Sequence, residues 1–594
     1  MTDPRPLVLL VQLPIPPPGA QPVQGNVPLA AAYLKLFARR RGLESSLRIE
    51  ILPPPLADTL GDQAMVEEIL RRGPWLVGFT CYLWNIARVL WIAERLKAAD
   101  PEIRILLGGP EITADNRWVL EQPAIDFAIL GEGEQTFAEL LAQMYPAHSV
   151  CRFPERHTEC AGYIGIPGLW TRRGGTPARR VPLADLDAIA SPYVEGILDV
   201  GPGETMFLET VRGCRYRCKY CYYPKSYDSI CVASAEQVAA SLRYANRHHV
   251  GEVFLLDPTL NQRPDFAEFL RLLARENPDR RFSYSAELRA EGIDGETARL
   301  LAAANFKEVE VGLQSIDPEA QRRMGRPVDL AAFERGTAAM LAAGIRVRLD
   351  MILGLPGDTP DSIRRGLDYL DRVRPFSELQ VFNLSILPGT AFRAEAEALG
   401  LEYQPRPPYY VLRTPTLDVE AMYELMAEAQ DRFGIEFDVP ESLSRSDGAF
   451  RGEAIDRGCI VDLDSPSPAA VPPPGRRTQA FTLWLRAADF TQRQEAAADL
   501  IRRLLADNPH TTLRVVLEPA GDPALLTPDV LESLLAVCHE TVSYLDWYYS
   551  LHPGRLLGAK QLVVILPEPG RWEDVEEYAT VVAKSQIANL RSEI

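Results

Sequence analysis

The sequence predicts an α/β protein built from three successive units. The chain has 594 residues, more than one hydrophobic core ordinarily holds, so several domains are expected. Short apolar strand runs alternate with helical segments before residue 146 and again from residue 201. We therefore expect a doubly wound N-terminal domain, then a partial or complete α/β barrel, and last a C-terminal α/β or helical cap.

The composition is that of a globular protein, with 46% hydrophobic and 24% charged residues. No apolar run is long and uncharged enough to cross a bilayer, and the first residues lack the basic start of a signal peptide, so we expect a cytoplasmic protein without a membrane span. The net charge of −18 argues against a nucleic-acid partner. Nine cysteines are too few for a disulfide framework.

The first unit, residues 1–145, reads as a parallel sheet with helices on both faces. Its strand-like runs are residues 7–13, 75–79, 103–109 and 126–131, and its helices are expected at about 28–41, 86–99 and 136–143. Glycine or polar residues follow each run, at the carboxyl edge where such sheets bind ligands. Residues 146–200 are rich in Pro, Gly and Arg and are predicted to be a connector.

The second unit, residues 201–395, repeats strand and helix six times. The strand runs begin near residues 205, 252, 282, 308, 346 and 379, with helices expected at 235–248, 293–304, 330–343 and 359–372. Residues 396–594 mix helices with the runs FTLWLRA, TLRVVLE and QLVVILP, and are assigned to the C-terminal domain.

A cysteine triplet follows the first strand of the second unit. Cys214, Cys218 and Cys221 have the spacing C-x3-C-x2-C. Three thiolates can ligate three irons of a 4Fe–4S cluster and leave the fourth iron open. A zinc site normally takes four Cys or His ligands in paired knuckles, and no second pair follows here. The triplet therefore predicts an iron–sulfur cluster.

The region of about 206–390 resembles the radical S-adenosylmethionine (SAM) superfamily. In that family three such cysteines hold the cluster and take part in catalysis, and SAM chelates the open iron. The resemblance places Tyr220 against the adenine, and it places the stretch from Asp257 to Asn261 at the SAM amino group. It further implies SAM-facing roles for Glu287 and Arg289, for Gln314 and Ser315 in GLQS, and for Gly354 in GLPG.

The first unit resembles the cobalamin-binding domain of class B radical SAM methylases. The matching stretches are residues 24–34, 78–85, 106–113 and 126–137. The residues that the resemblance assigns to cobalamin are Asn26, Pro28, Leu29, Thr80, Tyr82, Leu83, Trp84, Asn85, Gly108, Gly109, Pro110, Gly131, Glu132, Gly133 and Glu134. The alternatives are a nucleotide-binding domain or one that has lost its ligand, although no G-x-G-x-x-G follows the first strand.

This domain departs from the many cobalamin proteins that ligate cobalt from below with a histidine. The first histidine of the chain is His148, beyond the domain. The resemblance therefore implies a base-off cobalamin without a histidine ligand, and Tyr82, Leu83 and Trp84 are the candidates beneath the cobalt.

Together these resemblances imply a cobalamin-dependent radical SAM methyltransferase. It would act through methylcobalamin on an unactivated or sp² carbon of a small-molecule or peptide-derived substrate, and would receive electrons from a flavodoxin or a ferredoxin. A cyclase or rearrangement enzyme with the same cofactors is the alternative, and a non-catalytic cobalamin or iron–sulfur sensor a distant one. A tRNA methylthiotransferase is rejected, because it needs three further N-terminal cysteines and residues 1–149 contain only Cys81.

Overall fold

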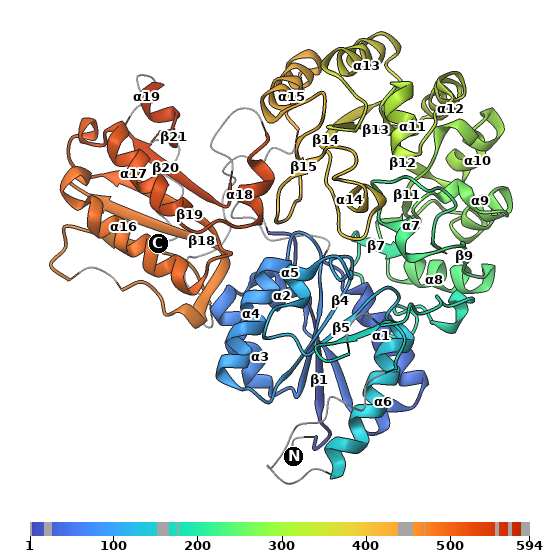
Figure 1. Ribbon diagram of the computed structural model, residues 1–594, viewed down its shortest axis with the longest axis horizontal. Helices are drawn as coiled ribbons and strands as arrows, with labels where there is room; N and C mark the ends of the chain where they lie inside the picture. The colour runs from blue at the N-terminus through green and yellow to red at the C-terminus, as the bar shows by residue number, and fades with distance from the viewer. Residues whose placement is uncertain are drawn as a thin grey trace.

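The computed structural model describes residues 3–16, 26–150, 165–174, 177–437, 455–467, 470–552, 558–567 and 573–583. It contains three large sheets, one in each predicted unit (Figure 1). Gln24 and Gly25, which begin one of the cobalamin-type stretches, lie outside the described residues. No helix in the described ranges has the length and apolar character needed to cross a membrane.

The N-terminal sheet has the strand order β2-β1-β3-β4-β5-β6 and is parallel except for β6. Its strands are β1 (Leu7–Gln12), β2 (Arg48–Ile51), β3 (Leu76–Thr80), β4 (Arg104–Gly108), β5 (Phe127–Ile129) and β6 (Leu169–Thr171). The order reverses between β1 and β3, which is the position where doubly wound sheets open a ligand crevice. Strand β6 comes from the segment that sequence patterning assigns to a connector, so part of that segment completes the sheet.

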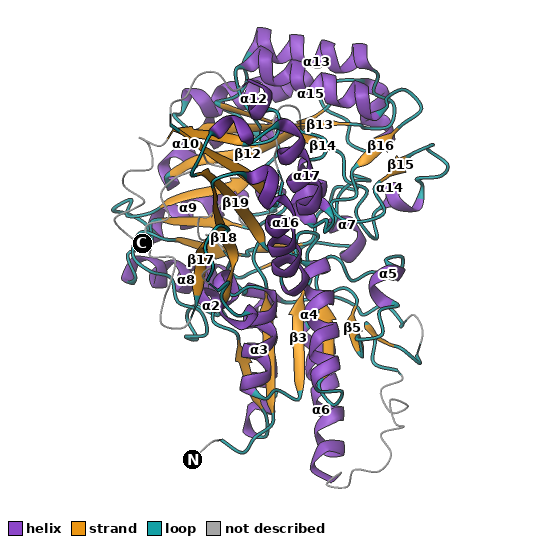
Figure 2. Cartoon of the chain, turned by 90° about the vertical axis from the view of Figure 1, so that its left-hand side faces the viewer, coloured by secondary structure: helices purple, strands orange, loops and turns teal. Residues whose placement is uncertain are grey.

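Alternating residues of the N-terminal strands build two cores, one on each face of the sheet. Val8 and Leu10 face one layer, whereas Leu9 and Val11 face the other. The helices are α1 (Leu29–Arg40), α2 (Pro54–Thr59), α3 (Asp62–Arg72), α4 (Ile86–Ala99), α5 (Arg117–Leu120) and α6 (Glu134–Val150). Helices α1 and α6 pack together, as do α3 and α4, and Figure 2 shows α3, α4 and α6 running alongside β3. The doubly wound prediction is confirmed.

The central sheet is parallel and has the order β14-β13-β12-β11-β10-β7. Its strands are β7 (Thr205–Leu208), β10 (Glu252–Leu255), β11 (Ser283–Glu287), β12 (Phe306–Gln314), β13 (Arg346–Leu353) and β14 (Glu378–Asn383). Because β7 and β14 end the sheet without pairing to each other, the barrel is partial.

Helices cover the outer face of the partial barrel. They are α8 (Ala235–Arg247), α9 (Phe266–Glu276), α10 (Gly295–Ala304), α11 (Pro318–Met324), α12 (Leu330–Ala342), α13 (Pro360–Val373) and, after the last strand, α14 (Ala391–Ala394) and α15 (Val419–Phe433). Local sequence sets their starts: α13 begins with a capping box between Thr359 and Ser362 and with Pro360 in its first turn. Between α14 and α15 lies a small pair of strands, β15 (Glu402–Tyr403) and β16 (Val411–Arg413).

The C-terminal domain is an α/β domain rather than a helical cap. Its parallel strands lie in sequence order, β17 (Asp456–Asp462), β18 (Arg477–Ala487), β19 (Thr512–Pro519), β20 (Lys560–Leu566) and β21 (Thr580–Ala583). The helices are α16 (Phe490–Asp507), α17 (Pro528–His539), α18 (Tyr544–Tyr549) and α19 (Glu573–Glu576). Strand β18 contacts α2 and α3, so this domain packs on the N-terminal domain.

Candidate functional site

The cysteine triplet lies on a loop whose two ends are pinned together. Strands β8 (Val211–Arg212) and β9 (Cys231–Val232) form a short antiparallel pair, which closes residues 213–230 into a loop. Gly213 starts the loop with φ +89°, and a Cβ there would clash with the carbonyl oxygen of Ser229. A glycine is therefore required where the chain turns into the triplet.

The three thiols are free and close to one another. Cys214 and Cys218 are buried and Cys221 is half-buried. Burial raises the pKa of the Cys221 thiol to about 12, and the neighbouring charges of Cys218 and Cys214 add to this effect. Desolvation also raises the pKa of Cys214, with Cys218 again contributing. Thiols of this kind become thiolate ligands when bound iron supplies positive charge, so the donor set fits a cluster.

No three His, Cys, Asp or Glu side chains of the described residues converge closely enough to hold a single metal ion. A cubane cluster does not require such convergence, because each cysteine ligates a different iron. The arrangement of the triplet is thus compatible with a cluster.

The segment after β10 holds the cysteine loop in place. Asp257 is buried and accepts hydrogen bonds from the backbone nitrogens of Thr210 and Val211, both at 2.7 Å. Gln262 donates to the carbonyl of Gly213 and accepts from the backbone nitrogen of Arg215, so its amide brackets Cys214. These contacts make Asp257 a residue that positions the cysteine loop, and its predicted place at the SAM amino group stays a prediction.

Several polar atoms of the barrel are buried without a hydrogen-bond partner among the described residues. They include Gln314 Oε1, Asp350 Oδ1 and Arg326 Nε. Gln314 has φ +68°, a strained conformation for a non-glycine residue, and follows an irregularity in the β12–β13 pairing. Arg326 hydrogen-bonds Cys218 and lies near Tyr220. Orphaned donors and acceptors beside the cysteines fit a polar cofactor such as SAM.

Two acidic groups of the barrel interior titrate near or above neutrality. Desolvation, with the nearby charge of Glu310, raises the pKa of Glu287 to about 8. The same two causes raise the pKa of Asp350 to about 9. Glu287 ends β11, at the carboxyl edge of the barrel sheet. Both carboxyls are mainly protonated at neutral pH and can donate hydrogen bonds.

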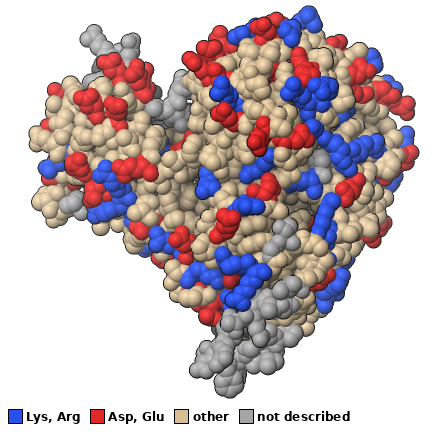
Figure 3. Space-filling model, in the orientation of Figure 1, with Lys and Arg blue, Asp and Glu red and all other residues tan. Residues whose placement is uncertain are grey.

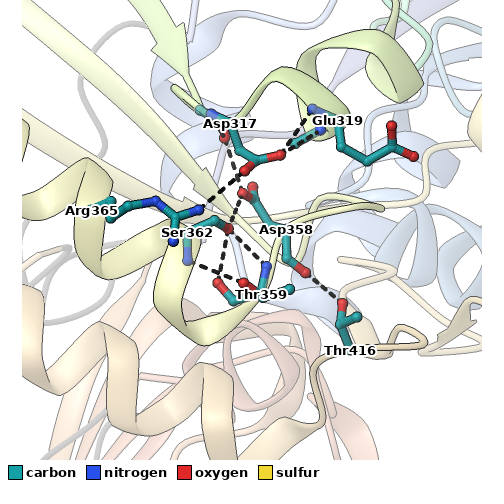
Figure 4. Close-up of polar contacts among 9 residues, drawn as sticks. Asp317, Glu319, Asp358, Thr359, Ser362, Arg365 and Thr416 are labelled. Carbon is teal, nitrogen blue, oxygen red and sulfur yellow. Dashed lines mark hydrogen bonds and ion pairs between the residues drawn. The ribbon is translucent and has the colours of Figure 1, made fainter.

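Two other residues assigned to SAM from sequence are engaged within the protein. The guanidinium of Arg289 bonds Glu291 and the carbonyl of Pro327, and stacks 4.3 Å from the ring centroid of Tyr216. Ser315 donates to Asp358, which follows the Gly354–Gly357 turn. Figure 4 shows Asp358 between Ser362 and Thr416, where it joins two strand ends. Tyr220 is half-buried beside the cysteines, and Gly354 has φ +89° with Met422 packed against it.

The carboxyl edge of the N-terminal sheet offers a flat and open surface. The rings of Tyr82 and Trp84 stack, with centroids 4.4 Å apart and planes 7° from parallel, and Leu83 is half-buried beside them. A Cβ at Gly108 or Gly131 would meet nothing within 4 Å. Gln12 Oε1, at the end of β1, and Thr113 Oγ1, in the loop after β4, are buried without partners. Flat apolar rings with nearby orphaned polar atoms fit the edge and amide arms of a corrin.

Other residues predicted to contact cobalamin also have partners within the protein, and their contact with cobalamin stays a prediction. Asn85 bonds Leu13 O, Thr80 O and Tyr82 N, and so fixes the loop after β3. Asn26 donates to Gln12 O and Asp58. A Cβ at Gly109 would overlap the backbone of Cys81, and one at Gly133 would press on Leu34. Pro28 caps α1, and Leu29 packs against the core of the barrel.

A buried ionic network joins the N-terminal domain to the start of the cysteine loop. Arg212 lies 2.5 Å from Glu132 and 3.1 Å from Glu134, and it also pairs with Glu209. Three of the four side chains are no more than 7% exposed. Glu132 and Glu134, assigned to cobalamin from sequence, therefore bind the barrel through Arg212.

A second polar contact ties the other end of the triplet to the same domain. Lys225, in α7 (Tyr223–Ser226), donates to the carbonyls of Pro110 and Pro388 and lies over the ring of Tyr222. Desolvation lowers the pKa of Lys225 to about 7, although Glu111 opposes this effect. Glu111 is buried and accepts a 2.7 Å hydrogen bond from Tyr409. The cysteine loop is thus attached to the N-terminal domain on both sides.

Comparison with known proteins identifies the N-terminal domain and the barrel that the cysteine loop connects. Residues 208–370 match the model of the radical SAM superfamily, and residues 21–141 match the B12-binding domain. The chain thus contains a radical SAM domain and a B12-binding domain. The cofactors of these two domains are a 4Fe–4S cluster, SAM and cobalamin.

Three relatives show what this radical SAM protein is similar to. It is 25% identical over 68% of its length to the cobalamin-dependent radical SAM methyltransferase TokK of Streptomyces tokunonensis, of which 60% is covered. It is 24% identical over 66% of its length to a 2-(S-pantetheinyl)-carbapenam-3-carboxylate methyltransferase of Streptantibioticus cattleyicolor, of which 59% is covered. The chain thus spans about three fifths of the length of these curated relatives. The methyltransferase TsrM of Kitasatospora setae, solved with tryptophan and a SAM analogue, shares the fold, with a TM-score of 0.55, 20% identity and coverage of 72% of this chain and 89% of that one.

Sequence reasoning missed several residues of the site. The sequence analysis assigns no role to four of them: Arg212, Lys225, Arg326 and Asp350. Arg212 and Lys225 nevertheless flank the cysteine triplet closely in sequence. Their positive charge beside the cysteine motif is the one sequence signal that could have identified Arg212 and Lys225 as residues of the site. Arg326 carries no such signal, because only the packing of the end of α11 on the cysteine loop brings it to Cys218. Asp350 lies in the middle of β13, where no motif marks it.

Proposed function

We propose that this radical SAM protein is a cobalamin-dependent methyltransferase acting on a carbon atom of a small-molecule or peptide-derived substrate. One observation carries the proposal: Arg212 and Lys225, on either side of the triplet, bind the domain that carries the cobalamin-type edge. The cysteine loop and that edge are therefore parts of a single site. The methyltransferase names of the relatives support the same activity.

When bound, the cluster supplies one electron, SAM a 5′-deoxyadenosyl radical and cobalamin a transferable methyl group. The protein binds and orients these groups. Asp257 and Gln262 hold the cysteine loop, while Gln314, Asp350 and Arg326 offer polar atoms to SAM. The glycines of the N-terminal edge and the stacked Tyr82 and Trp84 leave room for the corrin.

The proposal is tested on anaerobically purified protein reconstituted with iron, sulfide, cobalamin and SAM. Iron and cobalt are measured per chain, a reductant is added, and S-adenosylhomocysteine and 5′-deoxyadenosine are quantified by mass spectrometry. A methyltransferase of this kind binds four irons and one cobalt and forms both products. Deoxyadenosine without S-adenosylhomocysteine would favour rearrangement chemistry, and protein without cobalt would contradict the proposal.

A Cys218→Ala variant is the control. It should lose iron and form no deoxyadenosine, whereas cobalamin binding stays at the wild-type level because the N-terminal edge is untouched.

A further inference from the structure

The two faces of the C-terminal sheet differ in what packs on them. On the first face, strand residues such as Leu483, Val515 and Leu562 share one core with residues of α16, α17 and α19. The core of the second face consists of Trp484, Val516, Val563 and Ile565, with Ile460 and Val582 packed beside them. All of these lie in strands, so no helix of the described residues contributes to the second core.

Three polar side chains form a row across the second face. Arg514, in β19, is in register with Thr482 of β18 on one side and with Gln561 of β20 on the other. Each of the three lies two residues before a member of the second core, so their side chains point to the same side of the sheet. Neighbouring strands are about 4.8 Å apart, so the three side chains are adjacent.

The row borders a small hollow in the second face. The lining residues are Ala480, Phe481, Thr482, Thr512, Leu513, Arg514 and Gln561. The hollow measures about 220 Å³ with its solvent-open part included. None of the described lining residues is acidic, so the hollow lacks the carboxylates that a metal cation prefers. The guanidinium, hydroxyl and amide of the row are hydrogen-bond donors, which suit an anion.

Arg514 has no counter-charge of its own. Its side chain is half-buried, and its Nε is buried without a hydrogen-bond partner. No ion pair joins its guanidinium to another described residue. Desolvation lowers the pKa of Arg514, and no neighbouring carboxylate offsets that effect. An unpaired charge withdrawn from water is costly, so a partner for this guanidinium is expected.

Other arginines of the domain do have such partners. Arg486, which points to the same face, pairs with Glu518 at 3.2 Å. Carboxylates also pair with Arg476, Arg477, Arg493, Arg502 and Arg503. Figure 3 shows exposed acidic and basic side chains interspersed over this domain, which lies at the left. Arg514 therefore differs from these arginines in lacking a carboxylate within the described residues.

An arginine in this setting matches a particular class of ligand. Its planar guanidinium can donate to two oxygens of one carboxylate or phosphate group at once. On either side of it, the Thr482 hydroxyl and the Gln561 amide make no hydrogen bond to another described residue, so their donors are free for the same ligand. We propose that Thr482, Arg514 and Gln561 form an oxyanion-binding site, which takes the carboxylate or phosphate group of a ligand of the C-terminal domain.

The test measures anion binding to purified full-length protein by equilibrium dialysis at constant ionic strength. One arm uses radiolabelled inorganic phosphate and the other radiolabelled acetate. Wild type should bind at least one of them about tenfold or more tightly than Arg514→Gln, because the variant loses the charged fork. Arg514→Lys keeps the charge without the fork and should fall between the two. Thr482→Val removes one donor and should weaken binding less than Arg514→Gln.

Arg503→Gln is the matched control. Arg503 lies in the same domain, but its side chain is 67% exposed and pairs with Asp499 at 3.0 Å, so this variant should bind both anions like wild type. Arg514→Gln removes a charge that leaves no partner behind, so it should stay folded. Circular dichroism and urea unfolding of every variant check this.

The two arms distinguish the sources of the oxyanion. Specific binding of phosphate alone would support a phosphate-bearing ligand, and specific binding of acetate alone a carboxylate-bearing one. Equal binding by wild type and Arg514→Gln in both arms would overturn the site, as would an equal loss in Arg503→Gln. The result does not depend on the proposed methyl transfer, since none of the residues assigned to cluster, SAM or cobalamin lies in this domain.

Discussion

Gln262 is a side chain whose amide serves two backbone groups on opposite sides of Cys214. It is 1% exposed, so neither the Gly213 carbonyl nor the Arg215 N–H gains a water molecule if the amide is lost. An unsatisfied buried backbone group costs about 1–3 kcal/mol. The structure therefore makes the order of the cysteine loop depend on a residue about fifty positions away in sequence.

We expect Gln262→Leu to lower the iron content after reconstitution and to speed its loss to a chelator. Gln262→Glu should fall between Leu and wild type, because a carboxylate still accepts from Arg215 N but cannot donate to Gly213 O. Iron per chain is measured before and after a timed chelator challenge. Gln494→Leu, at a half-buried glutamine in α16 that bonds Ser533, is the control and should retain full iron.

Asp350 makes stability depend on pH. Its pKa of about 9 lies above the ordinary aspartate value, because it is desolvated beside Glu310. Between about pH 4 and pH 9 the folded chain keeps a proton that the unfolded chain loses, so this group lowers the free energy of unfolding as pH rises, by up to about 1.4 kcal/mol per pH unit. Asp350→Asn cannot lose that proton. Its stability relative to wild type in urea unfolding should increase from pH 5 to pH 8, and parallel pH profiles would contradict the assignment.

At the scale of elements, the cysteine loop is held at its base rather than along its length. The β8–β9 pair spans only two residues on each side, and the turn into the triplet depends on Gly213. A short pair can hold the loop because Asp257 bonds the backbone just before it and Gln262 brackets the first cysteine.

Gly213→Ala should displace the loop and reduce iron binding. A left-handed residue other than glycine costs about 1–2 kcal/mol, and the added methyl also meets the Ser229 carbonyl. Gly203 has φ +79° with open space around its Cβ position, so Gly203→Ala has the same backbone cost without the clash. Iron content and thermal unfolding of both variants are compared. Equal iron loss in the two would show that the contact with Ser229 is unimportant.

At the scale of the whole molecule, the Arg212 network fixes the N-terminal domain against the barrel. Removing one partner of a buried ion pair costs about 3–5 kcal/mol, because the remaining charges stay desolvated. We expect Arg212→Gln to lower the melting temperature, to split unfolding into separate transitions in calorimetry, and to weaken cobalamin retention.

Removing the two most buried carboxylates should recover part of this loss. The triple variant Arg212→Met/Glu132→Gln/Glu134→Gln leaves only the more exposed Glu209 without its partner and should unfold closer to wild type than Arg212→Gln alone. Arg72→Gln, which removes an ion pair to Glu68 within the N-terminal domain, should cost about 1 kcal/mol or less. A triple variant less stable than the single one would show that the ionic network itself, rather than charge balance, joins the domains.

Much of the fold follows from local pattern. Helix α4 covers the predicted residues 86–99, and all six predicted barrel strands are present. Strand β2 and helix α3 are absent from the prediction. Strand β2 is short, and only one of its four residues is fully buried, so its apolar pattern is weak. The domain boundaries at 145, 200 and 395 stay predictions, although β6 shows that the connector contributes to the first sheet.

The sequence by itself predicted the iron–sulfur cluster from the spacing of three cysteines, and its resemblance to two known domains implied SAM and cobalamin. Cysteine spacing, strand–helix alternation and glycines at strand ends are local features, and local features are readable along a chain. Only the tertiary structure decided which protein groups the polar residues of these motifs contact. Asp257, Asn85, Glu132 and Glu134 look like ligand contacts in sequence, yet their partners are protein groups, most of them distant in the chain. A side chain's role depends on what the fold brings within hydrogen-bonding distance, and that is set by packing between elements rather than by neighbours in sequence.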